Sequence, residues 1–177
     1  MELQEALQKR RSVRSYQKQK VEEEKIKKML EAAILAPSWK NSQVTRYYVV
    51  TGEEMLEKVK ETLPEFNRKN VQDAPVLIVS AIIRDRSGFE RDGTPSNELG
   101  NGWGYYDYGM QSMNLLLAAK EQGLDTLVMG IRDAGKIAEL LEIPKEQSVV
   151  SVIGVGYSQA EPAMPKRKTV ADIARFY

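Results

Sequence analysis

The stretch YYDYGMQSMNLLLAAKEQG, residues 105–123, decides the fold. Wound as a helix, it places apolar side chains on almost every side: Met110, Met113, Leu115, Leu116, Leu117, Ala118 and Ala119. A helix of that kind is stable only when other parts of the chain cover it. We therefore predict a central, buried helix over Tyr105–Gln122, with Gly123 as its C-cap.

Shorter segments on both sides of this helix predict the remaining helices and strands. Apolar residues at helical spacing predict further helices over residues 2–10, 22–36, 53–63 and 133–141. β-Branched and aromatic runs predict strands over residues 47–51, 75–83, 124–130 and 149–156. The last two strands and the helix between them read as one strand–helix–strand crossover, Leu124–Gly156. This order predicts one central sheet with helices packed on its faces.

Two polar segments fall outside these elements. Residues 84–104 hold five glycines and are typical of a long surface loop, which in a compact domain is usually functional or mobile. Residues 159–177 carry two prolines and the basic triplet Lys166–Lys168. This tail has too little apolar surface to form a core alone, so we expect it to lie along another surface.

Composition narrows the possible chemistry. The 177 residues suit one domain, and they include neither cysteine nor histidine. Thiol nucleophiles, Ser-His-Asp triads, thiolate zinc sites and imidazole bases are therefore excluded. The acidic run Glu22–Glu24 fits the first turn of a helix better than a metal site. An enzyme of this composition has to use carboxylates, lysine, tyrosine or a bound cofactor.

The chain carries no sign of membrane insertion or export. Its longest strongly apolar run, Pro75–Ile83, is too short to cross a bilayer. Met1 leads directly into Glu2 and Leu3, without the basic and apolar regions of a signal peptide. We therefore expect a cytoplasmic protein that does not bind a membrane.

The segment KRRSVRSY, residues 9–16, concentrates positive charge near the start. In an extended segment Arg10, Ser12 and Arg14 point to one side, and guanidinium groups match the oxygens of a phosphate. An anion site is one interpretation, although charge alone favours a solvated basic turn. A nucleic-acid partner is disfavoured, because 26 basic residues face 25 acidic ones. Neither a P-loop nor a dinucleotide-binding glycine motif is present.

The segment PSWKNSQ, residues 37–43, is a second candidate. It is either a plain loop between a helix and a strand or a row of amide and hydroxyl groups that binds a flat heterocycle. Trp39 would then offer a stacking surface. The pattern alone does not decide between these interpretations.

The order of motifs resembles that of a known family. It runs RRSVRSY (10–16), LAPSWKNSQ (35–43), RYYVV (46–50), YGMQSMNLLLAAKEQGL (108–124), DTLVMGI (125–131), LLEIP (140–144), VVSVIGVGY (149–157) and PKRK (165–168). Over nearly the whole chain it is similar to the nitroreductase family of FMN-dependent oxidoreductases. The resemblance implies a single domain, 1–177, with an α+β fold and a central, mostly antiparallel sheet flanked by helices. It also implies a homodimer in which the C-terminal segment wraps onto the partner.

The resemblance further implies a function. NADH or NADPH reduces FMN, and the flavin reduces nitroaromatics, quinones or similar acceptors in a ping-pong cycle. Two FMN molecules are expected at the subunit interface. Hydride passes directly from nicotinamide to flavin, so no catalytic side chain and no metal are implied.

Residues that match the family's flavin-binding positions are Arg10, Arg11, Ser12, Arg14, Ser38, Asn41, Gln43, Met129, Gly130, Ile131, Arg167 and Lys168. By resemblance, the cations of the segment 10–14 bind the phosphate together with Arg167 and Lys168. Arg14 approaches the pyrimidine edge of the ring. The segment Met129–Ile131 lies against the ring. The loop that holds Ser38, Asn41 and Gln43 contacts the ring, often from the other subunit.

This sequence departs from the family at several positions. Trp39-Lys40 stands where the family often has a small residue and glycine, and Val44-Thr45 where it often has Pro-Trp. The region that usually shapes the substrate pocket is reduced to residues 84–104. Two alternatives therefore stay open: a flavin-binding relative with another reaction, dehalogenation or flavin fragmentation, or a non-enzymatic flavin- or anion-binding module. The physiological acceptor and the choice between NADH and NADPH leave no readable mark.

Overall fold

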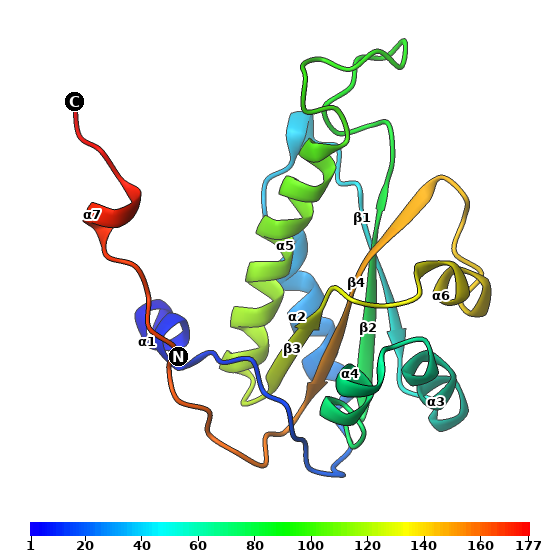
Figure 1. The fold of residues 1–177 in the computed structure, drawn as a ribbon, viewed down its shortest axis with the longest axis vertical. Helices are drawn as coiled ribbons and strands as arrows, with labels where there is room; N and C mark the ends of the chain where they lie inside the picture. The colour runs from blue at the N-terminus through cyan, green and yellow to red at the C-terminus, as the bar shows by residue number, and fades with distance from the viewer.

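The computed structural model describes residues 1–177 and contains one four-stranded antiparallel sheet (Figure 1). Its strands lie in the order β1 (Thr45–Val50), β2 (Val76–Ile83), β4 (Gln147–Gly156) and β3 (Asp125–Met129). All three pairings are antiparallel. The expected α+β fold with a mostly antiparallel sheet is therefore confirmed.

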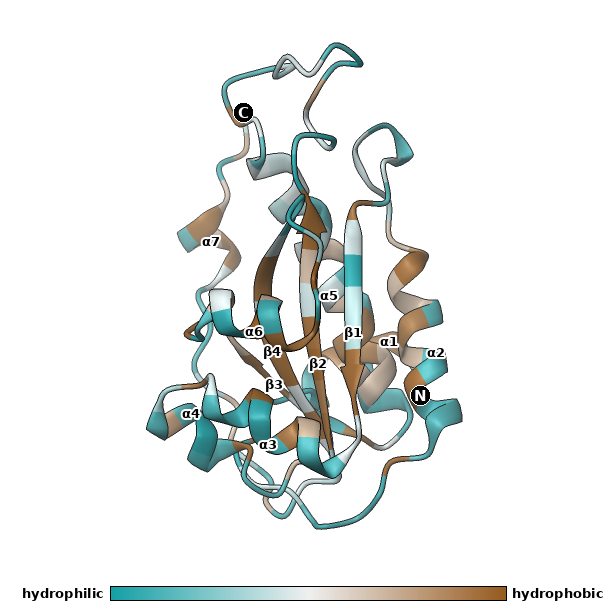
Figure 2. Cartoon of the chain, turned by 90° about the vertical axis from the view of Figure 1, so that its right-hand side faces the viewer, coloured by the Kyte–Doolittle hydropathy of each residue, from teal (hydrophilic) through white to brown (hydrophobic).

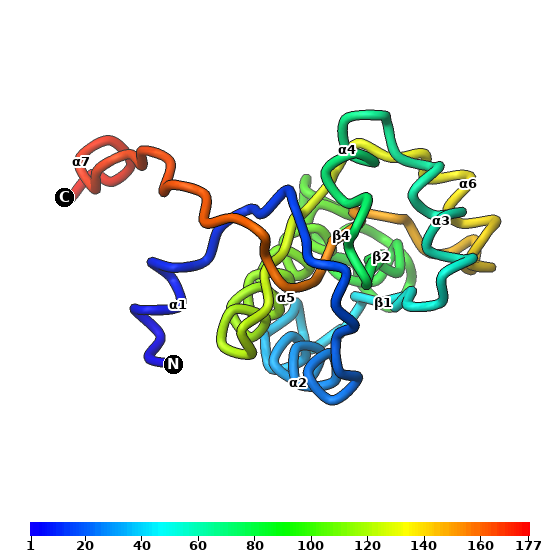
Figure 3. Tube along the Cα trace, turned by 90° about the horizontal axis from the view of Figure 1, so that it is seen from below, coloured from blue at the N-terminus to red at the C-terminus, as the bar shows by residue number.

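Helices cover both faces of the sheet (Figures 1 and 3). On one face lie α2 (Glu23–Ile34) and α5 (Gly102–Glu121), whose apolar residues form one core cluster with the strands. On the other face lie α3 (Glu53–Glu61), α4 (Glu65–Asn70) and α6 (Ala134–Leu140), beside a second core cluster. The strands form the apolar layer between the two sets of helices (Figure 2).

The two most apolar segments of the sequence take the most buried positions. In β2, every residue from Val76 to Ile82 is buried, because helices cover both faces of this inner strand. The predicted central helix is α5, and Leu115 and Ala119 on it are fully buried. It ends before Gly123, whose φ of +75° is the left-handed conformation expected of a glycine after a helix.

Three details of the predicted elements are wrong. The unit Leu124–Gly156 is not a crossover, because β3 and β4 are antiparallel neighbours and α6 is an excursion between them. Helix α4 was not expected, since its sequence EFNRKN holds a single apolar residue. Helix α5 starts at Gly102 rather than Tyr105, because Gly104 fits closely against Ile82 and continues the helix.

The two ends of the chain leave the main body together. Helix α1 (Leu3–Lys9) is followed by an extended segment that lies along the edge of the sheet, where the Val13 N–H donates to the Thr126 carbonyl (3.0 Å). The tail runs past α1 and ends after α7 (Val170–Ile173), standing away from the sheet (Figures 1 and 3). Residues 163–177 are all exposed, so no surface of the same chain receives them.

Tyr16 fastens the N-terminal segment to the sheet. Its buried hydroxyl donates to the carbonyls of Val13 (3.1 Å) and Gly154 (3.3 Å), and burial raises its pKa well above the ordinary value. A Cβ on Gly154 would lie 2.8 Å from Val71 Cγ1, and one on Gly156 would lie 3.0 Å from Tyr16 Cδ1. The glycines of β4 therefore make the space that Tyr16 fills.

We expect Gly154→Ala to lower the free energy of unfolding by about 1–3 kcal/mol, because the new methyl group has to displace Val71 or Tyr16. Gly135→Ala in α6 is the matched control, since its Cβ would meet only Asp133, at 3.6 Å. That change should be neutral or stabilising, as alanine is the better helix former. Urea unfolding followed by circular dichroism measures both variants, and equal stability would contradict the prediction.

Candidate functional site

A group of arginines without acidic partners lies where the two ends of the chain pass each other. Arg10 and Arg167 are close enough that the charge of Arg167 and that of Arg11, after burial as the main cause, lower the pKa of Arg10. Every ion pair in the chain uses a lysine or the terminal amino group, and none uses an arginine. Converging cations that no carboxylate neutralises favour an anion between them.

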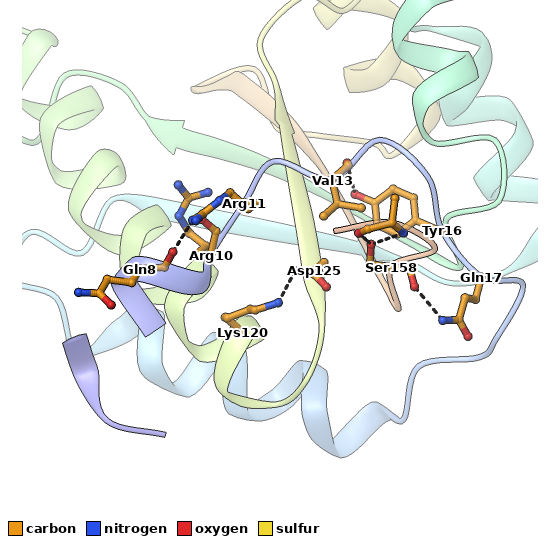
Figure 4. A network of polar contacts seen from close by, with 10 residues as sticks. Gln8, Arg10, Arg11, Val13, Tyr16, Gln17, Lys120, Asp125 and Ser158 are labelled. Carbon is orange, nitrogen blue, oxygen red and sulfur yellow. Dashed lines mark hydrogen bonds and ion pairs between the residues drawn. The ribbon is translucent and has the colours of Figure 1, made fainter. Parts of the chain in front are cut away.

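The two neighbouring arginines have different surroundings. The Arg11 guanidinium folds back and donates to the carbonyls of Gln8 and Arg10, beside α1 and the end of α5 (Figure 4). Arg11 also lines a cavity of about 790 Å³ near the ion pair of Lys120 and Asp125, which are 2.8 Å apart. Arg11 is therefore the member of the predicted phosphate group that is held by its own helix.

The other predicted phosphate-site residues of these two segments, Ser12, Arg14, Arg167 and Lys168, are exposed. Arg14 donates to the Ser12 carbonyl (3.3 Å), and Arg167 donates to the Pro165 carbonyl (3.4 Å). The Ser12 hydroxyl forms no hydrogen bond within the chain, and Lys168 lies on the exposed tail beside Arg167. These groups are therefore available to a ligand at little cost in broken contacts.

The structure places the N-terminal segment and the predicted segment Met129–Ile131 at the same strand, β3. Ser12 pairs with Thr126 in a parallel bridge, so both chains run in the same direction along the edge of the sheet. Beyond this bridge the N-terminal segment leaves β3, since Tyr16 pairs with Ser158, which lies past the Gly156 that pairs with Asp125 at the start of β3. Gly130 and Ile131 follow at the end of β3 and are exposed. The basic segment therefore contacts the start of β3, and the Met129–Ile131 segment lies at the other end of the same strand.

The loop with Ser38, Asn41 and Gln43 lies elsewhere in the same chain. The loop forms the short helix η1 (Trp39–Asn41), and Asp107, near the start of α5, accepts the Trp39 N–H. Helix α1 is tied to the other end of α5 by the Met1 amino group, 3.4 Å from Glu121. Asp107 and Glu121 are about 21 Å apart along a straight helix. A single chain does not bring the loop to the arginines.

The loop has an unusual backbone. Lys40, Asn41 and Gln43 have φ values of 46°, 54° and 48°, a left-handed conformation that costs side-chain-bearing residues roughly 1 kcal/mol or more each. The carboxylate of Asp107 holds this conformation by accepting the Trp39 N–H (3.1 Å) and the Ser42 hydroxyl (3.4 Å). The Ser38 hydroxyl accepts the Gln43 N–H at 3.0 Å.

Sequence reasoning missed Asp107, which is only 1% exposed. It also accepts the hydroxyl hydrogen of Ser87 (2.5 Å), so it joins the 38–43 loop to the loop after β2. A readable signal was present, because a carboxylate inside an apolar helix has to be hydrogen-bonded when buried. Which groups satisfy it could not be read from the sequence.

The ring of Trp39 is partly covered within the chain, which limits its predicted stacking role. Its ring lies against that of Trp103 with a centroid separation of 4.6 Å. The ring centroids of Trp103 and Tyr106 are 5.7 Å apart. Lys40 pairs with Glu90 of the long loop at 3.0 Å. One side of Trp39 is thus occupied within the chain, and the two loops form one connected surface.

The chain contains no group of three or more histidine, cysteine, aspartate or glutamate side chains placed to hold a metal ion. Likewise, none of the helices has the length and apolar character that crossing a bilayer requires.

Comparison with known sequences identifies relatives along most of the chain. The profile described as "Nitroreductase family" matches residues 7–157. A protein of Methanothermobacter thermautotrophicus, provisionally named NADH dehydrogenase/NAD(P)H nitroreductase, is 36% identical over 167 residues, which cover 92% of this chain and 80% of that protein.

Solved structures show the same fold. A nitroreductase family protein from Streptococcus pneumoniae superimposes with a TM-score of 0.87 at 23% identity, covering 99% of this chain and 100% of that one. A provisionally named nitroreductase from Exiguobacterium sibiricum, crystallised in complex with FMN, gives a TM-score of 0.88 at 24% identity, covering 100% of this chain and 98% of that one.

We expect Asp107→Ala to release the 38–43 loop, because the donors on Trp39, Ser42 and Ser87 lose their acceptor. The loss should lower the free energy of unfolding by about 3 kcal/mol and speed amide hydrogen exchange at residues 39–43. Tyr108→Phe is the control: it removes a buried hydroxyl, 2.6 Å from the Ser151 hydroxyl, and touches no donor of this loop. Exchange that is equally slow in both variants would show that Asp107 does not hold the loop.

Proposed function

Because the chain belongs to the nitroreductase family, we propose that it is an FMN-dependent oxidoreductase that takes electrons from NADH or NADPH. The whole chain, residues 1–177, forms its single FMN-binding domain. The acceptors are nitroaromatics, quinones or similar compounds, and the protein works as a homodimer.

The observation that carries this proposal is the crossing of the two chain ends, which brings the basic segments near each other with no arginine in an ion pair (Figures 1 and 3). A phosphate dianion between them satisfies the guanidinium groups of Arg10 and Arg167, and each charge-assisted hydrogen bond contributes about 1.5–3 kcal/mol. Ser12 and Lys168 supply further donors. These residues fit the phosphate end of a mononucleotide.

The ring end of the cofactor has a matching surface. Gly130 and Ile131 are exposed at the end of β3, the strand that also pairs with Ser12, and they offer a platform with little side-chain bulk at Gly130. Arg14 of the N-terminal segment provides a positive charge that stabilises electron density on the ring. When bound, FMN supplies the hydride chemistry that the side chains cannot.

The chain's own part in the reaction is to bind and orient. Hydride transfer from a nicotinamide needs no protein acid or base for its first step, which suits a chain without histidine or cysteine. Holding donor and acceptor at the same edge provides much of the acceleration. We therefore assign no catalytic side chain.

A second copy of the chain completes the site. Ser38, Asn41 and Gln43 are too far along α5 to reach the arginines of their own chain, so the partner's loop supplies them. Apolar side chains left exposed on α5 and the tail provide the contact surface: Tyr105, Tyr106, Met113, Val170, Ile173, Phe176 and Tyr177. Exposed apolar patches of this kind mark protein interfaces.

We expect the purified wild-type protein to be yellow, to release FMN on denaturation, and to oxidise NADH or NADPH with a nitroaromatic or quinone. Arg10→Ala combined with Arg167→Ala should weaken FMN binding about 100-fold or more, because two charge-assisted contacts are lost. Arg68→Ala is the control, as it removes an exposed arginine from the opposite helix layer. Titration of FMN fluorescence measures each affinity.

Each other outcome has a definite meaning. Wild-type affinity in the double variant would remove the phosphate role of these arginines. A colourless protein that takes up no added FMN would refute the function itself. FMN binding without oxidation of pyridine nucleotide would favour a non-enzymatic module, and turnover that consumes the flavin or a halogenated substrate would favour the other reactions.

Ile173→Asp with Phe176→Asp should convert the dimer into a monomer, because both side chains are exposed on the tail, at 73% and 88%. Light scattering measures the mass in solution. Phe66→Asp, at an exposed apolar site of α4, should leave the dimer intact. A wild-type protein that is a stable monomer, or a double variant that stays dimeric, would contradict this assembly.

A further inference from the structure

The turn after β3 leaves three successive backbone donors free. The N–H groups of Gly130, Ile131 and Arg132 donate no hydrogen bond to any backbone or side-chain acceptor of the chain. Gly130 and Ile131 are exposed, so this backbone lies at the surface where β3 ends. The next N–H, that of Asp133, is already bonded to the Thr62 carbonyl at 2.8 Å.

The carbonyl groups of the same peptides, in contrast, are held by side chains. The Arg132 guanidinium donates to the Gly130 carbonyl at 2.8 Å and also to the Val149 carbonyl of β4. The Asn67 side-chain amide donates to the Ile131 carbonyl at 3.1 Å. Asn67 comes from α4, the helix that the sequence did not predict, and it is the one buried residue of that helix.

Peptide geometry turns these two contacts into an orientation of the free donors. All peptide bonds in the chain are trans, so each N–H points opposite to the carbonyl of its own peptide group. The guanidinium contact at Gly130 therefore fixes the direction of the Ile131 N–H. The amide contact at Ile131 likewise fixes the Arg132 N–H, which points away from Asn67 and the layer of α4.

We propose that Asn67 and Arg132 are positioning residues that aim the Ile131 and Arg132 N–H groups at acceptor atoms on one edge of the flavin ring. This rests on the proposed function, since it requires FMN at the end of β3. Free N–H groups bind an electron-rich heteroatom without rearrangement when their peptides are already fixed. The two side chains touch the turn and not the ring.

The pattern of satisfied and unsatisfied groups supports a role beyond folding. The Arg132 Nε is buried and has no partner, so this side chain carries a cost while it holds two carbonyls. Three elements, the end of α3, helix α4 and strand β4, all reach the turn through polar contacts. A turn that only had to connect β3 with α6 would not need its carbonyls clamped from both sides.

Asn67→Leu and Arg132→Lys test the proposal. Leucine is close to asparagine in size but cannot donate a hydrogen bond to the Ile131 carbonyl. Lysine keeps the positive charge of Arg132 but lacks the forked guanidinium that reaches the carbonyls of Gly130 and Val149. Each should weaken binding of oxidised FMN about 5-fold, the loss expected for one well-placed hydrogen bond. Reduced FMN, with more electron density on the ring, should lose more affinity, so the midpoint potential becomes more negative.

Lys60→Met is the matched control. Lys60 is a buried polar residue of α3 in the same layer, it donates to the Gln72 carbonyl at 2.7 Å, and it does not touch the turn. Its loss should lower stability while FMN affinity and potential stay at the wild-type values. Spectroscopic titration with a reference dye gives the potential, and fluorescence quenching gives the affinity.

The outcomes separate the two claims. Wild-type protein that binds FMN, with both variants unchanged in affinity and potential, would overturn the role of Asn67 and Arg132 and leave the proposed function standing. Wild-type protein without FMN binding would overturn both. If Asn67→Leu fails to fold, Arg132→Lys still decides, because it leaves α4 intact.

Discussion

The rigid span of α5 is the constraint on which the site depends. One end of this buried helix holds Asp107 and the 38–43 loop, and the other end lies beside α1 and the basic segment. Since a straight helix cannot shorten, the two halves of the predicted flavin site stay apart in one chain. One chain therefore does not hold both halves together, and the helix that sets the distance also exposes the apolar side chains of Tyr105, Tyr106 and Met113.

The charge distribution near the two chain ends favours an anion. The arginines near the two chain ends approach one another without a carboxylate to offset their repulsion, although the chain as a whole carries almost equal numbers of acidic and basic residues. The acidic residues are used elsewhere, in lysine ion pairs along the helices. Local charge imbalance inside a neutral molecule is what a phosphate site requires and what a nucleic-acid surface does not resemble.

Preorganised backbone is the third common feature. The 38–43 loop keeps three residues in a left-handed conformation through Asp107, and the turn after β3 keeps its carbonyls on Asn67 and Arg132. In both places a buried side chain of another element, Asp107 or Asn67, fixes the backbone. The fixed peptides have left-handed dihedral angles in the loop and free N–H donors in the turn. Such an arrangement costs stability in the absence of a ligand and lowers the reorganisation needed when one binds.

The sequence by itself determined the sheet-and-helix content, the central helix and the basic segments, because apolar periodicity and charge are local properties. It could not determine that β3 and β4 are antiparallel neighbours or that α4 exists, since these depend on packing between distant segments. The roles of three residues, Asp107, Asn67 and Arg132, could not be predicted for the same reason. Each acts through a hydrogen bond to a group that only the folded chain brings near. Tertiary structure alone decided that the two basic chain ends cross while the 38–43 loop stays remote, because the length of α5 separates that loop from α1.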